Sequence, residues 1–497
     1  MFMMNFINYL NKLLSSPGNK ISQQVIHGSI WVFALQIINQ TFKICRTIIL
    51  ARLLAPKDFG IFGISMLTIS ILETFTNMGF ERALIQKKQN VGEYLDTAWT
   101  IQIFHTVFIS LLLFSLAPLS ARFFNEPRVI LIIRYLALGV LIMGFKNIGI
   151  MYFQKEIEFH KYFACELSSS LINLLVTISA AFLLKNIWAL VIGIIMGNCA
   201  YTIISYVIHP YRPKLEINWL KVNNLFSFGK WILASSIISF LALQGDDIVL
   251  GKILGVGALG LYQIAFLFSN FAATEITHVI TKVMFPAYSK LQDDTAYLSR
   301  AFLGSLEFTV FLCLPASILI LLFGSDFTIL VLGIKWMPIV PALQILTISG
   351  LFRSITATGS PLFRAVFMPQ LSAYMNSYRV LIMFIAIFPL TIKYGINGSS
   401  IAVLLSVLST IPTWLNRSSK IIKMKRLSII SKILPIFIIS FSNYFLFYFI
   451  KKLLFQINFL DMFFLSTLFI TIYTGIYVFL WYKYNYGPFK ILLILKQ

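Results

Sequence analysis

Charged and amide side chains recur at helical spacing inside the apolar runs of this sequence. Within residues 28–50, Gln36, Asn39, Lys43 and Arg46 follow one another at intervals of three or four residues, which places them along one side of a helix. An ionisable group in a membrane-spanning helix costs several kcal/mol unless it faces protein or water. Each such stripe is therefore a candidate site, and a guanidinium group on it would bind phosphate through two parallel hydrogen bonds.

Other apolar runs carry polar side chains in the same way. These are Ser70, Glu73, Asn77 and Glu81; Glu166, Ser170, Asn173 and Thr177; Asp246 and Asp247; Glu275 and His278; Ser349, Arg353, Thr356 and Ser360; and Ser372, Asn376 and Arg379. Stripes of this length indicate that the helices line an aqueous cavity, which we expect between two lobes of the protein.

Two sets of candidate site residues follow from these stripes. The cations predicted to line this cavity and to bind an anionic, phosphate-bearing substrate are Lys43, Arg46, Arg353 and Arg379. The acids predicted to couple transport to an ion, or to act as counter-ions, are Glu73, Asp246, Asp247 and Glu275. The alternative for the cations is that they form structural ion pairs with these acids, or extend their charged ends to the membrane surface.

The elements that carry the stripes are membrane helices. Of the 497 residues, 58% are hydrophobic and 12% are charged, whereas soluble domains have about 25% charged residues. A spanning helix needs about 20 mainly apolar residues, and this criterion predicts an all-α polytopic membrane protein with about fourteen transmembrane helices. Lys and Arg are denser in the connections on the side shared by both termini, which predicts cytoplasmic termini. We attribute the net charge of +22 to this bias and to the attraction of basic residues to anionic lipid. We therefore expect no nucleic-acid partner.

The chain contains an internal repeat. A shift of 231 − 31 = 200 residues superposes Trp31 on Trp231 and Gly60 on Gly260, but it places Arg46 on Asp246. The repeat predicts two parallel six-helix lobes followed by two further helices. The expected divisions are a cytoplasmic interfacial segment at 1–26, an N-lobe at 27–210, a cytoplasmic linker at 211–228, a C-lobe at 229–420, and additional helices with a cytoplasmic tail at 421–497.

One apparent motif is rejected. Gly255, Gly257 and Gly260 match the G-x-G-x-x-G pattern of dinucleotide sites, but the preceding segment is a predicted membrane span, so we predict a tight turn between two helices. No metal or cofactor motif is present, and no connection is long enough to build a soluble catalytic domain. We therefore expect a protein that is not an enzyme and has no cofactor other than a coupling ion, either H⁺ or Na⁺.

Several short stretches resemble a known family. They are A-R-L-L-A-P-K-D-F-G-I-F-G (51–63), G-F-E-R-A-L-I-Q-K-K (79–88), L-D-T-A-W (95–99), L-G-L-Y-Q-I-A (259–265) and F-P-A-Y-S-K-L-Q-D-D (285–294). On these residues the chain resembles the Wzx-type oligosaccharide flippases of the multidrug/oligosaccharidyl-lipid/polysaccharide exporter superfamily, in the branch of the colanic and teichuronic acid exporters.

The resemblance implies a function. It implies two helical bundles around a central cavity, whose alternating access moves an undecaprenyl-pyrophosphate-linked oligosaccharide across the bacterial cytoplasmic membrane. The implied partners are the lipid-linked oligosaccharide, membrane lipids and a polysaccharide polymerase, and we expect a monomeric transporter. Two alternatives are a multidrug-and-toxin-type exporter, whose mostly cationic substrates a basic cavity would repel, and a membrane polymerase or glycosyltransferase, for which the loops are short and poor in carboxylates.

Overall fold

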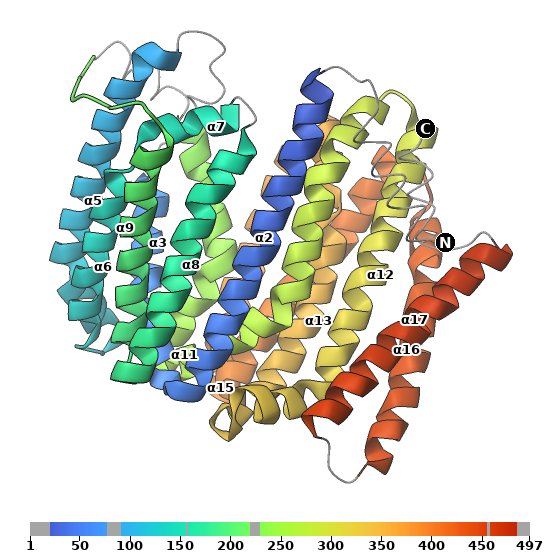
Figure 1. Cartoon of the computed structure of the whole chain (residues 1–497). Coiled ribbons are helices and arrows are strands. Elements are labelled where there is room, and N and C mark those ends of the chain that lie inside the picture. Colours follow the sequence, from blue (N-terminus) through green and yellow to red (C-terminus); the bar gives the residue numbers. More distant parts are fainter. Residues whose placement is uncertain (1–19, 77–90, 156–157, 219–228, 455–457, 485–497) are drawn as a thin grey trace. The chain divides into compact units, whose positions relative to one another are not determined.

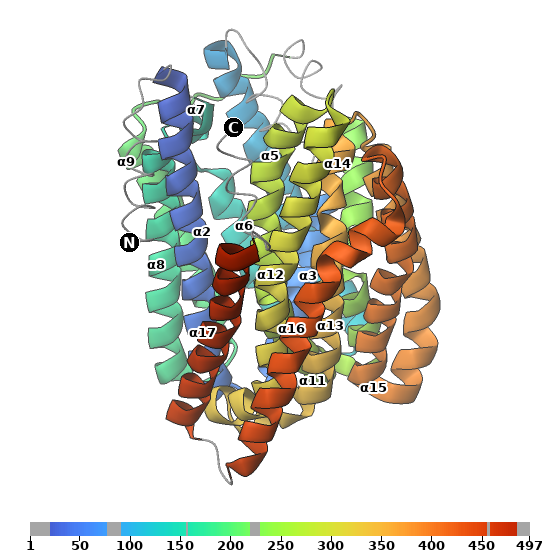
Figure 2. The ribbon, with the colours of Figure 1, turned by 90° about the vertical axis from the view of Figure 1, so that its right-hand side faces the viewer.

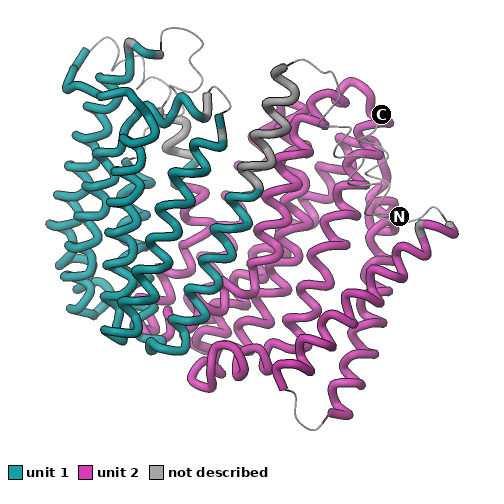
Figure 3. The backbone as a smooth tube through the Cα atoms, in the orientation of Figure 1, with its two compact units in different colours: residues 1–237 teal, residues 238–497 magenta. Residues whose placement is uncertain are grey.

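The structure is a computed structural model that describes residues 20–76, 91–155, 158–218, 229–454 and 458–484. Within these ranges it consists of helices and loops and contains no strand, which confirms the predicted all-α fold class. The chain divides into two compact units, residues 1–237 and residues 238–497 (Figure 3). The motif at 79–88 and most of the predicted interfacial segment at 1–26 lie outside the described residues.

The described part of unit 1 contains six long helices and three short ones. The long helices are α2 (Lys20–Leu53), α3 (Pro56–Thr76), α5 (Leu95–Phe124), α6 (Val129–Gly144), α8 (Phe159–Leu184) and α9 (Trp188–Ile208), and the short ones are η1 (Val91–Tyr94), η2 (Ile148–Ile150) and α7 (Met151–Lys155). In this unit α8 packs against both α9 and α2, while α5 and α6 pack against each other and against α3 (Figure 1). These segments are helical because lipid offers no partner for backbone polar groups, which must bond within each helix.

Ion pairs join the ends of three helices in unit 1. Glu126 lies in the connection between α5 and α6, where its carboxylate accepts hydrogen bonds of 2.8 and 3.3 Å from Arg128. Lys57, in the first turn of α3, lies 3.3 Å from the same carboxylate. The hydrogen bonds from Arg128 lower the pKa of Glu126, so this carboxyl stays ionised and holds the three helix ends together at neutral pH.

The segment that follows α9 is fixed to the start of α5. The carboxylate of Asp96 accepts hydrogen bonds of 2.6 Å from the Tyr211 hydroxyl and of 2.6 Å from the backbone N–H of Lys214. Burial raises the pKa of Tyr211, so its hydroxyl remains a donor. The predicted linker at 211–228 is thus attached to unit 1 through its first residues, and its part at 219–228 lies outside the described residues.

Unit 2 is built around long helices that share one core. Its elements are α11 (Gly229–Leu291, which begins before the unit boundary), α12 (Thr295–Phe327), the π-helix η3 (Thr328–Leu332), the 3₁₀-helix η4 (Ile334–Ile339), α13 (Val340–Ala357), α14 (Gly359–Ala365), α15 (Gln370–Ile421), α16 (Arg426–Leu453) and α17 (Phe459–Tyr484). One cluster of buried side chains takes members from α11, α12, α13, α15, α16 and α17. Figure 2 shows α16 and α17 beside α12, against which both pack.

Two of these helices are broken at a glycine. Gly255 in α11 has φ 78° and ψ −177°, and Gly395 in α15 has φ 59° and ψ −138°, so each long helix consists of two helices joined at one residue. Gly255 falls 255 − 55 = 200 residues after Ala55, which lies in the connection between α2 and α3. Both copies of the repeat therefore change direction at the same position, and the turn predicted at the G-x-G-x-x-G pattern is confirmed.

The helices have the length and composition of membrane spans. Ten helices in the described part of the chain are long and apolar enough to cross a membrane. Two of them, α11 and α15, are long enough to contain two spans each, one on either side of the glycine break. The protein is thus a multi-pass membrane protein, and the count of about fourteen crossings stays a prediction.

Candidate functional site

A buried carboxylate lies in the first half of α11. The Asp246 side chain is 3% exposed, and it accepts a hydrogen bond of 2.5 Å from the hydroxyl of Tyr262. The neighbouring half-buried Asp247 accepts a hydrogen bond of 3.1 Å from the amide of Gln263. In both pairs the acid and its donor lie sixteen residues apart on opposite sides of Gly255. The turn at Gly255 thus places the two halves of α11 so that Tyr262 and Gln263 reach the two acids.

Two arginines of the same unit accompany these acids. Arg353 on α13 donates a hydrogen bond of 2.8 Å from Nη2 to the hydroxyl of Thr274, and its guanidinium lies 5.7 Å from the centre of the Phe266 ring. Arg379, in the first half of α15, interacts electrostatically with both Arg353 and Asp246. The structure therefore brings together Asp246, Arg353 and Arg379, which come from three different helices.

The Arg379 guanidinium has an unused donor. Its Nε atom is buried and has no hydrogen-bond partner among the described residues. A buried N–H without an acceptor costs about 1–3 kcal/mol, so an anion that accepted a hydrogen bond from it would be stabilised.

We call Asp246, Asp247, Tyr262, Arg353 and Arg379 the Asp246 cluster. It contains two guanidinium groups and two carboxyl groups. An arginine can hold a phosphate through two N–H donors at once, and the carboxyl groups can serve as counter-ions while no anion is bound. The sequence predicted a basic interior. In unit 2 the cluster contains two basic side chains and two acidic ones.

The site residues predicted in unit 1 have other surroundings. Arg46 on α2 donates a hydrogen bond of 2.5 Å from Nη1 to the side-chain oxygen of Asn173 on α8, and its Nε atom is buried without a partner among the described residues. Lys43 and Glu73 are exposed on α2 and α3. The polar stripes of α2 and α8 thus face each other at Arg46 and Asn173, and within the described ranges Arg46 bonds to an amide and not to an acid.

The remaining predicted acid lies in the second half of α11. Glu275 is half-buried and interacts electrostatically with His278, one helical turn away on the same helix. No group of three or more potential metal ligands occurs among the described residues.

Sequence reasoning missed the donors Tyr262, Gln263 and Thr274. A signal for the first two existed, because the turn predicted at Gly255 places residues before and after it side by side along the two halves of α11. Thr274 offered no such signal, because its contact with Arg353 joins residues 79 positions apart.

Sequence comparison identifies relatives of this chain. Residues 49–341 match the family described as polysaccharide biosynthesis protein. The chain is 28% identical to the lipopolysaccharide biosynthesis protein WzxC of Escherichia coli (strain K12) over 348 residues, 69% of each chain. It is 23% identical to the teichuronic acid biosynthesis protein TuaB of Bacillus subtilis (strain 168) over 74% of this chain and 77% of that one.

Solved structures with the same fold are transporters. The lipid II flippase MurJ in an inward closed conformation matches with a TM-score of 0.71 at 16% identity, covering 91% of this chain and 98% of that one. An inward-facing multidrug resistance transporter of the MATE family matches with a TM-score of 0.59 at 15% identity, covering 78% of this chain and 96% of that one. The predicted transporter fold is confirmed, and because the family match spans more than half of the sequence, the chain belongs to the polysaccharide biosynthesis protein family.

Proposed function

We propose that this protein moves undecaprenyl-pyrophosphate-linked oligosaccharide repeat units across the bacterial cytoplasmic membrane for surface polysaccharide biosynthesis. The family match and the relatives WzxC and TuaB support a role in making such polysaccharides. A further relative, 20% identical, is the succinoglycan biosynthesis transport protein ExoT of Rhizobium meliloti (strain 1021), which supports transport as that role. The fold shared with the lipid II flippase is consistent with a lipid-linked substrate.

The observation that carries the proposal is the pair of arginines in the Asp246 cluster. Two guanidinium groups lie together among apolar helices, and one of them has a buried N–H without an acceptor among the described residues. A pyrophosphate would accept hydrogen bonds from Arg353 and Arg379 and would compete with Asp246 for the positive charge of Arg379. Binding of substrate would thereby release Asp246 from its counter-ion.

That competition offers a route to ion coupling. A carboxylate that loses its counter-ion in an apolar setting favours uptake of a cation, either H⁺ or Na⁺. We assign this role to Asp246 and Asp247 ahead of Glu73 and Glu275, because Asp246 interacts electrostatically with Arg379 and Asp247 is its neighbour in the chain. Lys43 and Arg46 remain candidate phosphate-binding cations of unit 1.

The transport cycle that we propose is alternating access by the two units of a monomer. Both termini would lie in the cytoplasm, as the distribution of Lys and Arg indicates. The flipped repeat unit would then pass to a polysaccharide polymerase on the outer side of the membrane.

The test is to replace Arg353 in cells that depend on this protein for their surface polysaccharide. Arg353→Ala removes a charge-assisted phosphate contact, and we expect export to fall about tenfold or more, with partial recovery in Arg353→Lys. Export would be measured as surface polysaccharide, and the amount of transporter by immunoblot of membranes. Lys393→Ala is the matched control, because Lys393 is an exposed cation beside Tyr394, outside the Asp246 cluster.

Different outcomes test the role of Arg353 and the proposed function. Normal polysaccharide in Arg353→Ala cells would remove Arg353 from the mechanism. Normal polysaccharide after deletion of the whole gene would contradict the proposed function, and loss of resistance to cationic drugs in those cells would favour the multidrug exporter alternative.

A further inference from the structure

A pocket of about 410 Å³ opens in unit 2 beside the C-terminal parts of α12 and α16 and the first turns of α13. Its polar lining comes from Ser325, Gln344, Tyr444, Tyr448, Lys451 and Lys452. None of these residues belongs to the Asp246 cluster, and the proposed transport mechanism does not use them. The volume falls within the range of about 300–1,000 Å³ that is typical of small-molecule sites.

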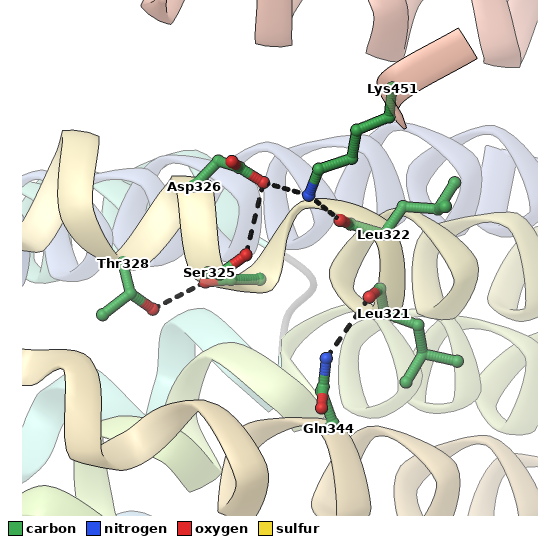
Figure 4. A network of polar contacts seen from close by, with 8 residues as sticks. Leu321, Leu322, Ser325, Asp326, Thr328, Gln344 and Lys451 are labelled. Carbon is green, nitrogen blue, oxygen red and sulfur yellow. Dashed lines mark hydrogen bonds and ion pairs between the residues drawn. The ribbon is translucent and has the colours of Figure 1, made fainter. Parts of the chain in front are cut away.

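Two interactions hold the ammonium group of Lys451 in position and leave one of its N–H donors unused. Its Nζ forms an ion pair with Asp326 and donates a hydrogen bond of 2.6 Å to the carbonyl oxygen of Leu322 (Figure 4). The ammonium also lies 5.4 Å from the centre of the Phe323 ring. An ammonium group has three N–H donors, so one donor remains for a ligand.

Lys452 gives the pocket an excess of positive charge. Its side chain is exposed and makes no ion pair with any described residue. Since Asp326 balances Lys451, the charge of the pocket is 2 − 1 = +1. The rings of Tyr444 and Tyr448 stack with centroids 6.1 Å apart and an interplanar angle of 23°, which places two phenol groups one turn apart on the pocket wall.

The surroundings of the pocket are apolar. The same helix α16 exposes Phe441, Phe445 and Phe449, at 48%, 56% and 62%. Lysine and tyrosine side chains at the end of an apolar span are typical of the membrane–water interface. A ligand at this place would therefore meet cations and hydroxyl groups at its head and an aromatic helix face along its tails.

We propose that this pocket binds the phosphate headgroup of an anionic phospholipid. The phosphodiester accepts hydrogen bonds from the ammonium groups of Lys451 and Lys452. Hydroxyl groups of the headgroup, as in phosphatidylglycerol, bond to the tyrosines, Ser325 and Gln344. Free phosphate is also an anion, but the exposed phenylalanines of α16 favour a ligand that also has acyl chains.

The test uses native mass spectrometry of the full-length protein titrated with phosphatidylglycerol, phosphatidylcholine or inorganic phosphate. Lys452→Gln should weaken phosphatidylglycerol binding about fivefold, which corresponds to about 1 kcal/mol for one basic residue at an anionic surface. Lys452→Gln combined with Tyr448→Phe should weaken it further. Both changes leave the ion pair between Lys451 and Asp326 in place, so folding is preserved and is checked by the thermal unfolding temperature.

Lys393→Gln is the matched control, because Lys393 is also exposed, lies over a tyrosine ring and sits at the end of a helix. The proposal predicts stronger binding of phosphatidylglycerol than of phosphatidylcholine, and full binding in Lys393→Gln. If Lys452→Gln and Lys393→Gln weaken phosphatidylglycerol binding equally, the effect comes from the overall surface charge, and the proposed lipid site is wrong. Full displacement of the lipid by low-millimolar inorganic phosphate would assign the pocket to free phosphate instead of lipid. The experiment measures lipid binding and not transport. Its result therefore tests the lipid site independently of the proposed transport function.

Discussion

At the scale of single residues, the side chain that most needs a partner is Asp246. A carboxyl that is 3% exposed within an apolar helix is costly unless it is hydrogen-bonded or paired. The structure supplies the Tyr262 hydroxyl at 2.5 Å and the positive charge of Arg379. The polar contacts of this residue are therefore what allows an ionisable group to occupy this position.

Replacing Tyr262 by Phe tests this dependence. The change removes only the hydroxyl donor, and we expect the free energy of unfolding in detergent to fall by about 1–3 kcal/mol, the range for a buried acceptor that loses its donor. Tyr135→Phe is the control, because Tyr135 is 48% exposed and packs its ring against Trp188 with centroids 5.0 Å apart. The control should change stability by less than about 0.5 kcal/mol. Equal stability of both variants would show that the Tyr262 hydroxyl does not stabilise Asp246.

At the scale of elements, the break in α11 decides which residues of its two halves can meet. Gly255 adopts φ 78° with ψ −177°, a region open almost only to glycine. The sequence pattern around it, Gly255, Gly257 and Gly260, imitates a nucleotide-binding loop but joins two membrane helices. The break also positions Tyr262 near Asp246, so the backbone conformation of one residue supports the Asp246 cluster.

Gly255→Ala and Gly257→Ala should therefore change stability in opposite directions. A Cβ atom at either position would meet no atom within 4 Å, so neither change introduces a clash. At Gly255 the positive φ makes alanine strained, and we expect a loss of about 1–3 kcal/mol. At Gly257 the backbone is helical, and alanine should gain about 0.5–1 kcal/mol. Unfolding in detergent micelles measures both, and a loss of equal size in the two variants would contradict the role of the Gly255 conformation.

At the scale of the whole molecule, the two helices that follow the repeat are integral to unit 2. The buried cluster of unit 2 includes Phe447 from α16 and Phe469, Tyr473 and Tyr477 from α17. The Tyr473 hydroxyl donates a hydrogen bond of 3.1 Å to the carbonyl oxygen of Phe311 on α12. Because lipid can cover an apolar helix face as well as protein can, close packing and polar contacts of this kind are what hold α16 and α17 in place.

A chain that ends at Lys425 should therefore accumulate poorly in membranes. It loses the packing of α16 and α17 and leaves Asp326 without Lys451. We expect at least a fivefold lower amount by immunoblot of membrane fractions. Tyr473→Phe in the full chain loses only one hydrogen bond, worth about 1 kcal/mol, and should accumulate normally. Normal amounts of the shortened chain would show that α12 needs neither helix.

The sequence by itself determined the membrane class, the helices, the repeat, the turn at Gly255 and the family. These features are local, because hydrophobic periodicity and glycine conformations act within about one or two helical turns, and the membrane forces each span to satisfy its own backbone. The sequence also singled out Asp246, Arg353 and Arg379 as candidate site residues, because charged residues inside apolar runs are uncommon.

Only the tertiary structure decided which of these groups meet. Arg46 bonds to Asn173 across 127 positions, Arg353 to Thr274 across 79, and Lys451 pairs with Asp326 across 125. Such contacts depend on how helices pack side by side, and the spacing of polar residues within one helix does not specify its neighbour. For the same reason the pocket that contains Lys452 has no signal in the sequence, since α12, α13 and α16 form it together.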